Sequence, residues 1–261
     1  MTLAPDLLAA LDRFAAHERI LVALDFDGTL APEVDDPAHA RALPDALDAL
    51  ARLHTMPGVT LALISGRSLA SLAAVSELPA DVPLVGSHGL EVQFDAGDAL
   101  PALGVADRER VDALLARLAP LVAATDGAWI EHKPAGCAVH TRLVDAVAAA
   151  ALNRAVRVAA LEGDGALTVR EGKNVVEFAV RDVTKGDGLL ALRGRFAPEA
   201  VLFAGDDLTD EDAFAVLEPD DLAIKVGTAA SRAAYRVADP AAVAQLLQHL
   251  NDLRHSLGIA Q

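Results

Sequence analysis

Two carboxylates stand directly after a short apolar run near the start of the chain. Residues 20–24 read ILVAL and the chain continues DFDGT, so Asp25 and Asp27 follow the run and Gly28 permits a sharp turn. Such a pair suits phosphate ester hydrolysis, because one carboxylate can attack phosphorus while the other moves protons. The alternative is a turn whose aspartates cap a helix. The residues alone do not indicate which of the two carboxylates attacks phosphorus and which moves protons.

A second acidic segment follows the apolar run 201–204. Residues 205–212 read GDDLTDED, with five acids within seven residues. Acids in the first turn of a helix are favoured by the helix dipole, which accounts for residues 209–212 as a helix start. Asp206 and Asp207 precede that helix, so we expect Asp206 to bind a metal ion. Mg²⁺ is the cation expected, because it prefers oxygen ligands and can screen carboxylate from phosphate.

Ser65 and Lys185 are weaker candidates for phosphate contacts. Ser65 follows the apolar run 59–64, and its hydroxyl could hold a phosphate oxygen or cap the next helix. Lys185 opens the helical stretch before residues 201–204. A lysine at a helix start is unfavourable for the dipole, which suggests a role toward a ligand. A solvated surface lysine is the alternative.

The elements that must position these groups are short apolar runs that alternate with amphipathic stretches. Buried parallel strands have this form, so we predict an α/β sheet in the terminal parts of the chain. Ligands bind at the carboxyl ends of such strands, where Asp25 and Asp27 would lie. The predicted strands are residues 20–24, 59–64, 82–85, 201–204 and 222–226.

The middle of the chain has a different pattern. We predict helices at residues 108–118 and 145–160, and strand pairs at 128–133 with 137–142 and at 167–170 with 175–179. This α-β-β-α-β-β order is typical of an α+β unit. We therefore expect a cap of residues 105–180, inserted into a core of residues 1–104 and 181–261. One continuous irregular domain is the alternative.

One face of the first predicted hairpin carries polar groups. Glu131 and Lys133 are two apart on a strand and share a face, and His140 and Arg142 do the same on the next strand. Charged groups of this kind make strong hydrogen bonds to hydroxyls. The alternative is a solvated face with cross-strand ion pairs.

Composition and charge limit the kinds of partner that this chain is expected to bind. The chain has 261 residues, is 53% hydrophobic and carries a formal net charge of −16. Such a field repels nucleic acid and anionic membranes, so we expect neither as a partner. The single Cys137 excludes an internal disulfide and fits a reducing cytoplasm. We expect no membrane span, because no apolar run is long enough, and we expect no secretory signal; the oligomeric state stays open.

The segments that carry Asp25, Ser65, Lys185 and Asp206, in this order along the chain, resemble the motifs of the haloacid-dehalogenase-like phosphatase superfamily. The resemblance implies a Rossmann-like parallel-sheet core with an inserted α+β cap. It implies that Asp25 is the nucleophile, Asp27 the general acid and base, and Ser65 and Lys185 the phosphate-binding pair. It also implies a Mg²⁺ site made by Asp25, Asp206 and the main-chain carbonyl of Asp27, with Asp207 supporting it.

A narrower resemblance links the chain to trehalose-6-phosphate phosphatases. The matching segments are DFDGTLAP from Asp25, SGR from Ser65, SHGLE from Ser87 and GDDLTDE from Gly205, with EHK, AVHTR and GKNVVE in the middle. The resemblance implies sugar contacts from the cap and further substrate contacts from the core. The residues implied are Glu131, Lys133, His140 and Glu177 in the cap, and Arg67, His88 and Gly89 in the core.

The resemblance thus implies hydrolysis of trehalose 6-phosphate through an aspartyl-phosphate. Sucrose-phosphate and mannosyl-3-phosphoglycerate phosphatases share a similar core and cap, so either substrate is an alternative. A non-catalytic sugar-phosphate-binding protein is a third reading.

Overall fold

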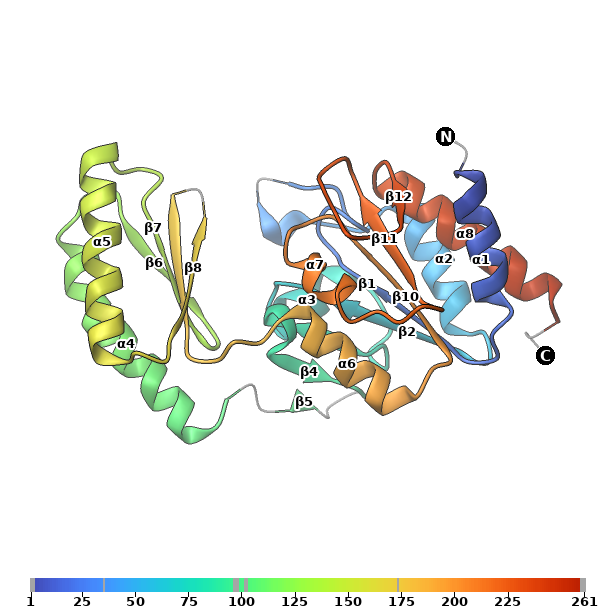
Figure 1. Ribbon diagram of the computed structural model, residues 1–261, viewed down its shortest axis with the longest axis horizontal. Helices are drawn as coiled ribbons and strands as arrows, with labels where there is room; N and C mark the ends of the chain where they lie inside the picture. The colour runs from blue at the N-terminus through green and yellow to red at the C-terminus, as the bar shows by residue number, and fades with distance from the viewer. Residues whose placement is uncertain (1–2, 35, 96–98, 101–102, 173, 259–261) are drawn as a thin grey trace. The chain divides into compact units, whose positions relative to one another are not determined.

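The computed structural model describes residues 3–34, 36–95, 99–100, 103–172 and 174–258. It divides into two compact units (Figure 1). The large unit comprises residues 1–100 and 183–261, and the small unit comprises residues 101–182.

The large unit is built on an eight-stranded sheet in the order β12-β11-β10-β1-β2-β3-β4-β5. Strands β12 to β3 pair in parallel, and β4 and β5 add antiparallel pairs at one edge. The predicted α/β parallel sheet is therefore confirmed. The strands are β1 (Ile20–Leu24), β2 (Val59–Ile64), β3 (Leu84–Gly86), β4 (Glu91–Gln93), β5 (Ala99–Leu100), β10 (Ala200–Gly205), β11 (Leu222–Val226) and β12 (Tyr235–Val237).

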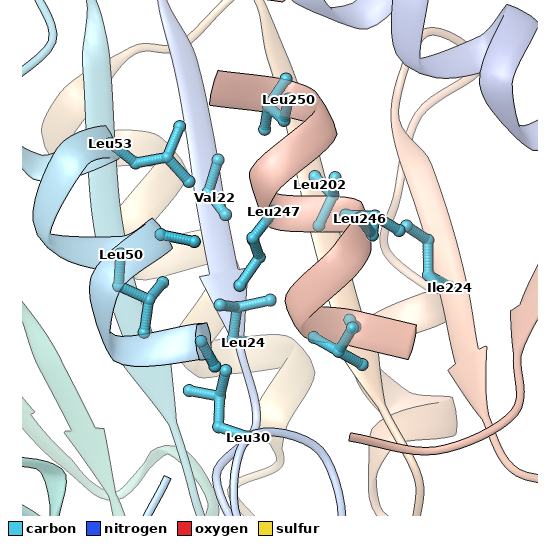
Figure 2. Packing of buried hydrophobic residues seen from close by; sticks show 14 of the residues in the cluster. Val22, Leu24, Leu30, Leu50, Leu53, Leu202, Ile224, Leu246, Leu247 and Leu250 are labelled. Carbon is cyan, nitrogen blue, oxygen red and sulfur yellow. The ribbon is translucent and has the colours of Figure 1, made fainter. Parts of the chain in front are cut away.

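Helices cover both faces of this sheet, because its central strands are apolar on both sides. Val22 and Leu24 of β1 pack into one layer, and Leu21 and Ala23 pack into the other. Figure 2 shows α2 and α8 over the first layer, with leucines of both helices against β1. That layer includes α1 (Pro5–Ala15), α2 (Pro44–His54), α3 (Leu69–Ser76) and α8 (Pro240–Ser256), and the other includes α6 (Lys185–Phe196) and α7 (Asp210–Phe214). The remaining short helices are η1 (Pro37–His39) and η2 (Ser87–Gly89).

One predicted strand of the large sheet is shifted. The sequence pattern predicts a strand at residues 82–85, whereas β3 covers Leu84–Gly86. Val82 donates its N–H back to Pro79 in a turn, and Pro83 has no N–H to give to a neighbouring strand. The strand therefore begins only after the proline.

The small unit has the predicted α-β-β-α-β-β order. Its antiparallel sheet has the strand order β6-β7-β9-β8, and α4 and α5 lie on one side of it (Figure 1). The elements are α4 (Val105–Ala123), β6 (Trp129–Lys133), β7 (Gly136–His140), α5 (Ala146–Gly163), β8 (Thr168–Gly172) and β9 (Val175–Ala179). Helix α4 is longer than predicted because its buried stripe continues to Val122.

Hydrophobic residues close the helix-covered side of this small sheet. Cys137, Val139 and Phe178 are fully buried there. Alternate residues of the same strands therefore point to the other side, which carries the polar groups. Among the described residues, no helix is both long and apolar enough to cross a membrane.

Candidate active site

Three neighbouring strands of the large unit end in polar residues at the same edge of the sheet. β1 lies between β10 and β2, and Leu24 is in register with Ala204 on one side and Leu63 on the other. The residues that follow these strands are Asp25, Asp206 and Ser65. Parallel register therefore gathers side chains that are far apart in sequence, at the edge where open α/β sheets bind ligands.

The turn after β1 is shaped around Asp206. Gly28 has a φ of 75°, and a Cβ added to it would lie 2.1 Å from Oδ2 of Asp206. Glycine is needed there for both the backbone conformation and the close approach. The next residue, Thr29, donates its hydroxyl to Oδ1 of Asp206 at 3.3 Å. The turn therefore fixes the position of a carboxylate that directly follows β10.

Lys185 is directed into this cluster rather than into solvent. Its Nζ lies 2.9 Å from Oδ1 of Asp25 and 2.7 Å from Oδ1 of Asp210, and the residue is 2% exposed. The start of α6 is capped independently, by a capping box of Thr184 and Asp187. The alternative of a solvated surface lysine is thus wrong.

Asp210 lies at the centre of the cluster. The sequence pattern placed it in the first turn of a helix, and α7 does begin at Asp210, but the pattern did not indicate that this carboxylate is fully buried. It accepts from Nζ of Lys185 and, at 2.8 Å, from the N–H of Asp207. A Cβ on Gly205 would lie 2.2 Å from Cγ of Asp210, so only glycine leaves room for it. The signal that could have indicated Asp210 is its position four residues after Asp206, in a segment that begins with Gly205.

The charges in the cluster do not balance. Burial raises the pKa of Asp25 to about 8, although Lys185 lowers it. Burial and the nearby Asp210 also raise the pKa of Asp206. Burial alone would lower the pKa of Lys185, but Asp25 and Asp210 outweigh it and raise that pKa, so the ammonium stays protonated. One ammonium is thus shared by two carboxylates and cannot offset both.

These carboxylates are close enough to hold one cation. Ligand oxygens of Asp25, Asp206 and Asp210 lie within 4.8 Å of one another. Oxygen ligands and an excess of negative charge suit a divalent cation such as Mg²⁺. Asp207, by contrast, is exposed, and its carboxylate accepts from the N–H of Leu208 at 2.7 Å.

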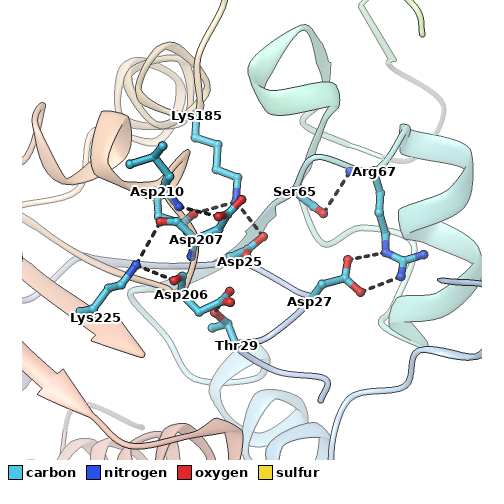
Figure 3. A network of polar contacts seen from close by, with 11 residues as sticks. Asp25, Asp27, Thr29, Ser65, Arg67, Lys185, Asp206, Asp207, Asp210 and Lys225 are labelled. Carbon is cyan, nitrogen blue, oxygen red and sulfur yellow. Dashed lines mark hydrogen bonds and ion pairs between the residues drawn. The ribbon is translucent and has the colours of Figure 1, made fainter. Parts of the chain in front are cut away.

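A second buried lysine, Lys225, supports the acidic loop, and no sequence motif indicated it. Lys225 of β11 is 1% exposed, and its Nζ donates to the carbonyls of Asp206 at 2.5 Å and Asp207 at 3.1 Å (Figure 3). A lysine inside an apolar strand pattern, beside an acidic loop, is the only signal the sequence offers. The ammonium holds the main chain at the position where Asp206 leaves β10.

Asp27 is paired with Arg67 in this structure. Nε and Nη2 of Arg67 each lie 2.6 Å from an oxygen of Asp27, which is a bidentate ion pair. Figure 3 shows this carboxylate directed to Arg67, on the side away from Lys185. The nearby hydroxyl of Ser65 accepts from the N–H of Arg67 at 3.2 Å. The structure thus brings a predicted substrate-binding residue onto the predicted general acid.

His88 and Gly89 lie beside the same turn. The N–H of His88 donates to the carbonyl of Ser65 at 3.0 Å, and a Cβ on Gly66 would lie 2.5 Å from the His88 ring. His88 has a φ of 56°, a conformation that is costly outside glycine and is found where neighbours enforce it. Gly89 lies against the carbonyl of Thr184, directly before Lys185.

The predicted sugar contacts of the small unit lie on one face of its sheet. Nε2 of His140 lies 2.8 Å from Oε2 of Glu131, and Nζ of Lys133 lies 3.1 Å from Oε2 of Glu177. The four side chains share the face opposite the helices, and both contacts run between strands, as the alternative interpretation expects. Lys173 of the GKNVVE segment lies outside the described residues.

Comparison with known proteins identifies similar sequences. The model of the trehalose-phosphatase family matches residues 23–247. The trehalose-phosphate phosphatase of Mycobacterium tuberculosis (strain ATCC 25618 / H37Rv) is 35% identical over 96% of this chain, which spans 66% of the relative. The trehalose-6-phosphate phosphatase of Escherichia coli (strain K12) is 34% identical over 82% of this chain and 80% of the relative. A bifunctional trehalose-6-phosphate synthase/phosphatase of Thermoproteus tenax is 34% identical, but the chain spans only 32% of its length.

Solved structures show the same architecture. The trehalose-6-phosphate phosphatase of Aspergillus fumigatus, in crystal form 3, aligns with a TM-score of 0.74 and 27% identity over 97% of this chain and 99% of that one. A haloacid dehalogenase-like hydrolase from B. subtilis aligns with a TM-score of 0.59 over 88% of this chain and 99% of that one. Its 17% identity supports a shared fold alone.

Proposed function

Because the chain belongs to the trehalose-phosphatase family, we propose that it hydrolyses trehalose 6-phosphate to trehalose and inorganic phosphate. The observation that carries this proposal is the buried carboxylate of Asp25, held by Lys185 next to Asp206 and Asp210. An aspartyl-phosphate mechanism needs such a set: a nucleophile, a cation for the phosphate, and further carboxylates for a metal ion.

In the proposed reaction an oxygen of Asp25 forms a bond to phosphorus while the bond from phosphorus to the sugar oxygen breaks. Asp27 donates a proton to that leaving oxygen and later accepts one from the water that releases phosphate. Ser65 and Lys185 bind phosphate oxygens. Both oxygens of Asp27 accept from Arg67 in the structure, so proton transfer requires Arg67 to release at least one of them.

We propose Mg²⁺ as the cofactor. Asp25, Asp206, Asp210 and the main-chain carbonyl of Asp27 would hold it, with Asp207 near the outside of the site. The donor set fits because it consists of oxygen atoms, and because the single ammonium of Lys185 is shared between two of the three carboxylates. When bound, the cation would reduce the repulsion between the nucleophilic carboxylate and the doubly charged phosphate.

We propose that the small unit is a cap of about residues 105–180 that recognises the sugar. Glu131, Lys133, His140 and Glu177 would bind its hydroxyls, since charged groups form strong hydrogen bonds. Arg67, His88 and Gly89 would contribute from the large unit. The single thiol of Cys137 supports a reducing compartment, so we place the protein in the cytoplasm.

The first test is phosphate release from a panel of substrates, each with Mg²⁺ and with chelator. The panel contains trehalose 6-phosphate, sucrose 6-phosphate, mannosyl-3-phosphoglycerate, glucose 6-phosphate and an aryl phosphate. We expect magnesium-dependent release with a strong preference for trehalose 6-phosphate. Preference for another sugar phosphate would overturn the sugar assignment and leave the chemistry. Binding of trehalose 6-phosphate without release from any substrate would favour a non-catalytic binding protein.

A further inference from the structure

The only tryptophan of the chain lies on the polar face of the small sheet, outside the hydrophobic cores. Trp129 begins β6 and is half-buried, and it is in register with His140 of β7. Strand partners in register point to the same face, which is the face of Glu131, Lys133 and Glu177. The helix-covered face, with Cys137 and its neighbours, is the apolar one. Core packing therefore does not explain an indole at this position.

The indole contacts two polar side chains. The rings of Trp129 and His140 are stacked, with centroids 4.6 Å apart and an interplanar angle of 6°. The guanidinium carbon of Arg142 lies 5.1 Å from the centroid of the Trp129 ring, within the range of a cation–π contact. The indole is thus a flat surface against which polar groups of this face are ordered.

The orientation of His140 is fixed from two directions. Its ring face lies on Trp129, and its Nε2 lies 2.8 Å from Oε2 of Glu131. The side chain of His140 is 23% exposed and that of Glu131 is 51% exposed, so both can still reach a ligand. A ring held on its face and at its edge has little rotational freedom left to lose when a ligand binds.

We propose that Trp129 is a positioning residue for sugar recognition: it holds the His140 imidazole, and through it Glu131, in one orientation toward the sugar hydroxyls. The inference rests on the proposed function, because it assumes that this face of the small unit binds the sugar. The position is specific to a planar side chain, since an aliphatic residue of similar volume would fill the space without stacking.

The first experiment compares kcat/KM for trehalose 6-phosphate and for an aryl phosphate, which lacks the sugar. Trp129→Leu should lower kcat/KM for trehalose 6-phosphate about five- to tenfold more than for the aryl phosphate, mainly through KM. Trp129→Phe should retain most of the wild-type kcat/KM for trehalose 6-phosphate, because the phenyl ring can still stack on His140. The matched control is His132→Ala, on the same strand but on the opposite face.

The outcomes separate the inference from the function on which it rests. If the wild type prefers trehalose 6-phosphate and Trp129→Leu changes both substrates equally, the positioning role is wrong. If the wild type hydrolyses the aryl phosphate and has no preference for trehalose 6-phosphate, the proposed function is wrong instead. A selective loss in His132→Ala as large as in Trp129→Leu would also overturn the inference.

A second measurement does not depend on the folding of the leucine variant. Because Trp129 is the only tryptophan, the emission of the protein reports on this site alone. In the Asp25→Asn background, trehalose 6-phosphate should change the emission in a saturable way, and His140→Gln in the same background should abolish the change. An emission that does not respond to His140→Gln or to trehalose 6-phosphate would overturn the proposal.

Discussion

At the scale of single residues, the site of the large unit is a group of buried charges that cannot all be satisfied by the chain itself. The ammonium of Lys185 is shared between Asp25 and Asp210, and that of Lys225 is used on main-chain carbonyls. Desolvation therefore raises the pKa of Asp25 to about 8. Functional sites typically contain buried charged groups that lower the stability of the fold but can bind a ligand.

The proposed role of Asp25 as the nucleophile can be tested by replacing its carboxyl group with an amide. Asp25→Asn should lower kcat about 10³-fold or more, because the amide cannot attack phosphorus. In chelator it should melt no lower than the wild type, since the buried carboxylate has a raised pKa and its ionisation costs stability. Phosphate release and thermal melting measure the two effects.

The control for this variant is Asp212→Asn, which makes the same chemical change at an exposed acid of α7. It should keep its turnover. Asp25→Asn with turnover above about 1% of the wild type would contradict the nucleophile assignment.

Lys225 provides a test of how the acidic loop is held. Lys225→Met keeps the length of the side chain but removes the hydrogen bonds to the carbonyls of Asp206 and Asp207. We expect the affinity for Mg²⁺ to fall about tenfold, as is usual when groups that orient metal ligands are lost. The rise in melting temperature with Mg²⁺ concentration measures that affinity.

Arg236→Met is the matched control, because Arg236 is the strand partner of Lys225 and is exposed. If both variants weaken Mg²⁺ binding equally, loss of positive charge alone explains the result and the hydrogen bonds do not matter.

At the scale of elements, apolar runs predicted the central strands well. Residues 20–24, 59–64 and 222–226 are strands with the predicted bounds, because strands buried on both faces are continuously apolar. The short strands β4, β5 and β12 were not predicted, since two or three residues are too few to show a period. The predicted start of β3 was wrong because Pro83 has no N–H for a hydrogen bond between strands, and an apolar run alone does not reveal this.

The site was predictable where its residues follow strands, and not where packing decides their environment. Asp25, Ser65 and Asp206 were identified because they end apolar runs. Asp210 was correctly assigned to a helix start, but its burial was not predicted, because acids in the first turn of a helix are common and the close approach at Gly205 depends on packing. Lys225 and Trp129 depend on strand register, which a single sequence does not reveal.

One ion pair between elements of the small unit gives a pH-dependent test. Nε of Arg110 in α4 lies 2.7 Å from Oδ2 of Asp164, directly after α5, and this hydrogen bond lowers the pKa of Asp164. A lowered pKa adds stability above the unfolded value of about 3.9, which is lost as the pH falls through the folded value. Asp164→Asn should therefore lower stability at pH 7, by about 1 kcal/mol or less for a partly exposed pair.

Denaturant unfolding at pH 7 and at a pH below about 3 measures the difference. Glu162→Gln, at an exposed acid in the last turn of α5, is the control and should show no such loss. A deficit for Asp164→Asn that is the same at both pH values would show that the ion pair is not its cause.

At the scale of the whole molecule, the single thiol reports on the small unit alone. Cys137 is fully buried, and burial, together with the charge of Glu177, raises its pKa to about 11. The folded protein should therefore react very slowly with a disulfide reagent at pH 8, and denaturant should release one reactive thiol per chain. Fast reaction of the folded protein would show that the sheet of the small unit opens readily.

The insertion of the small unit into the large one also sets an order for synthesis. Residues 101–182 are contiguous, so this unit can fold on the ribosome as soon as it emerges. Strand β1 is made early, yet its partner β10 leaves the ribosome only after the whole small unit. Until then a nascent chain exposes an apolar strand edge, the kind of surface that chaperones protect from aggregation. A translation stop before Gly205 would yield the small unit attached to a sheet that lacks β11, β12 and the segment that carries Asp206 and Asp210.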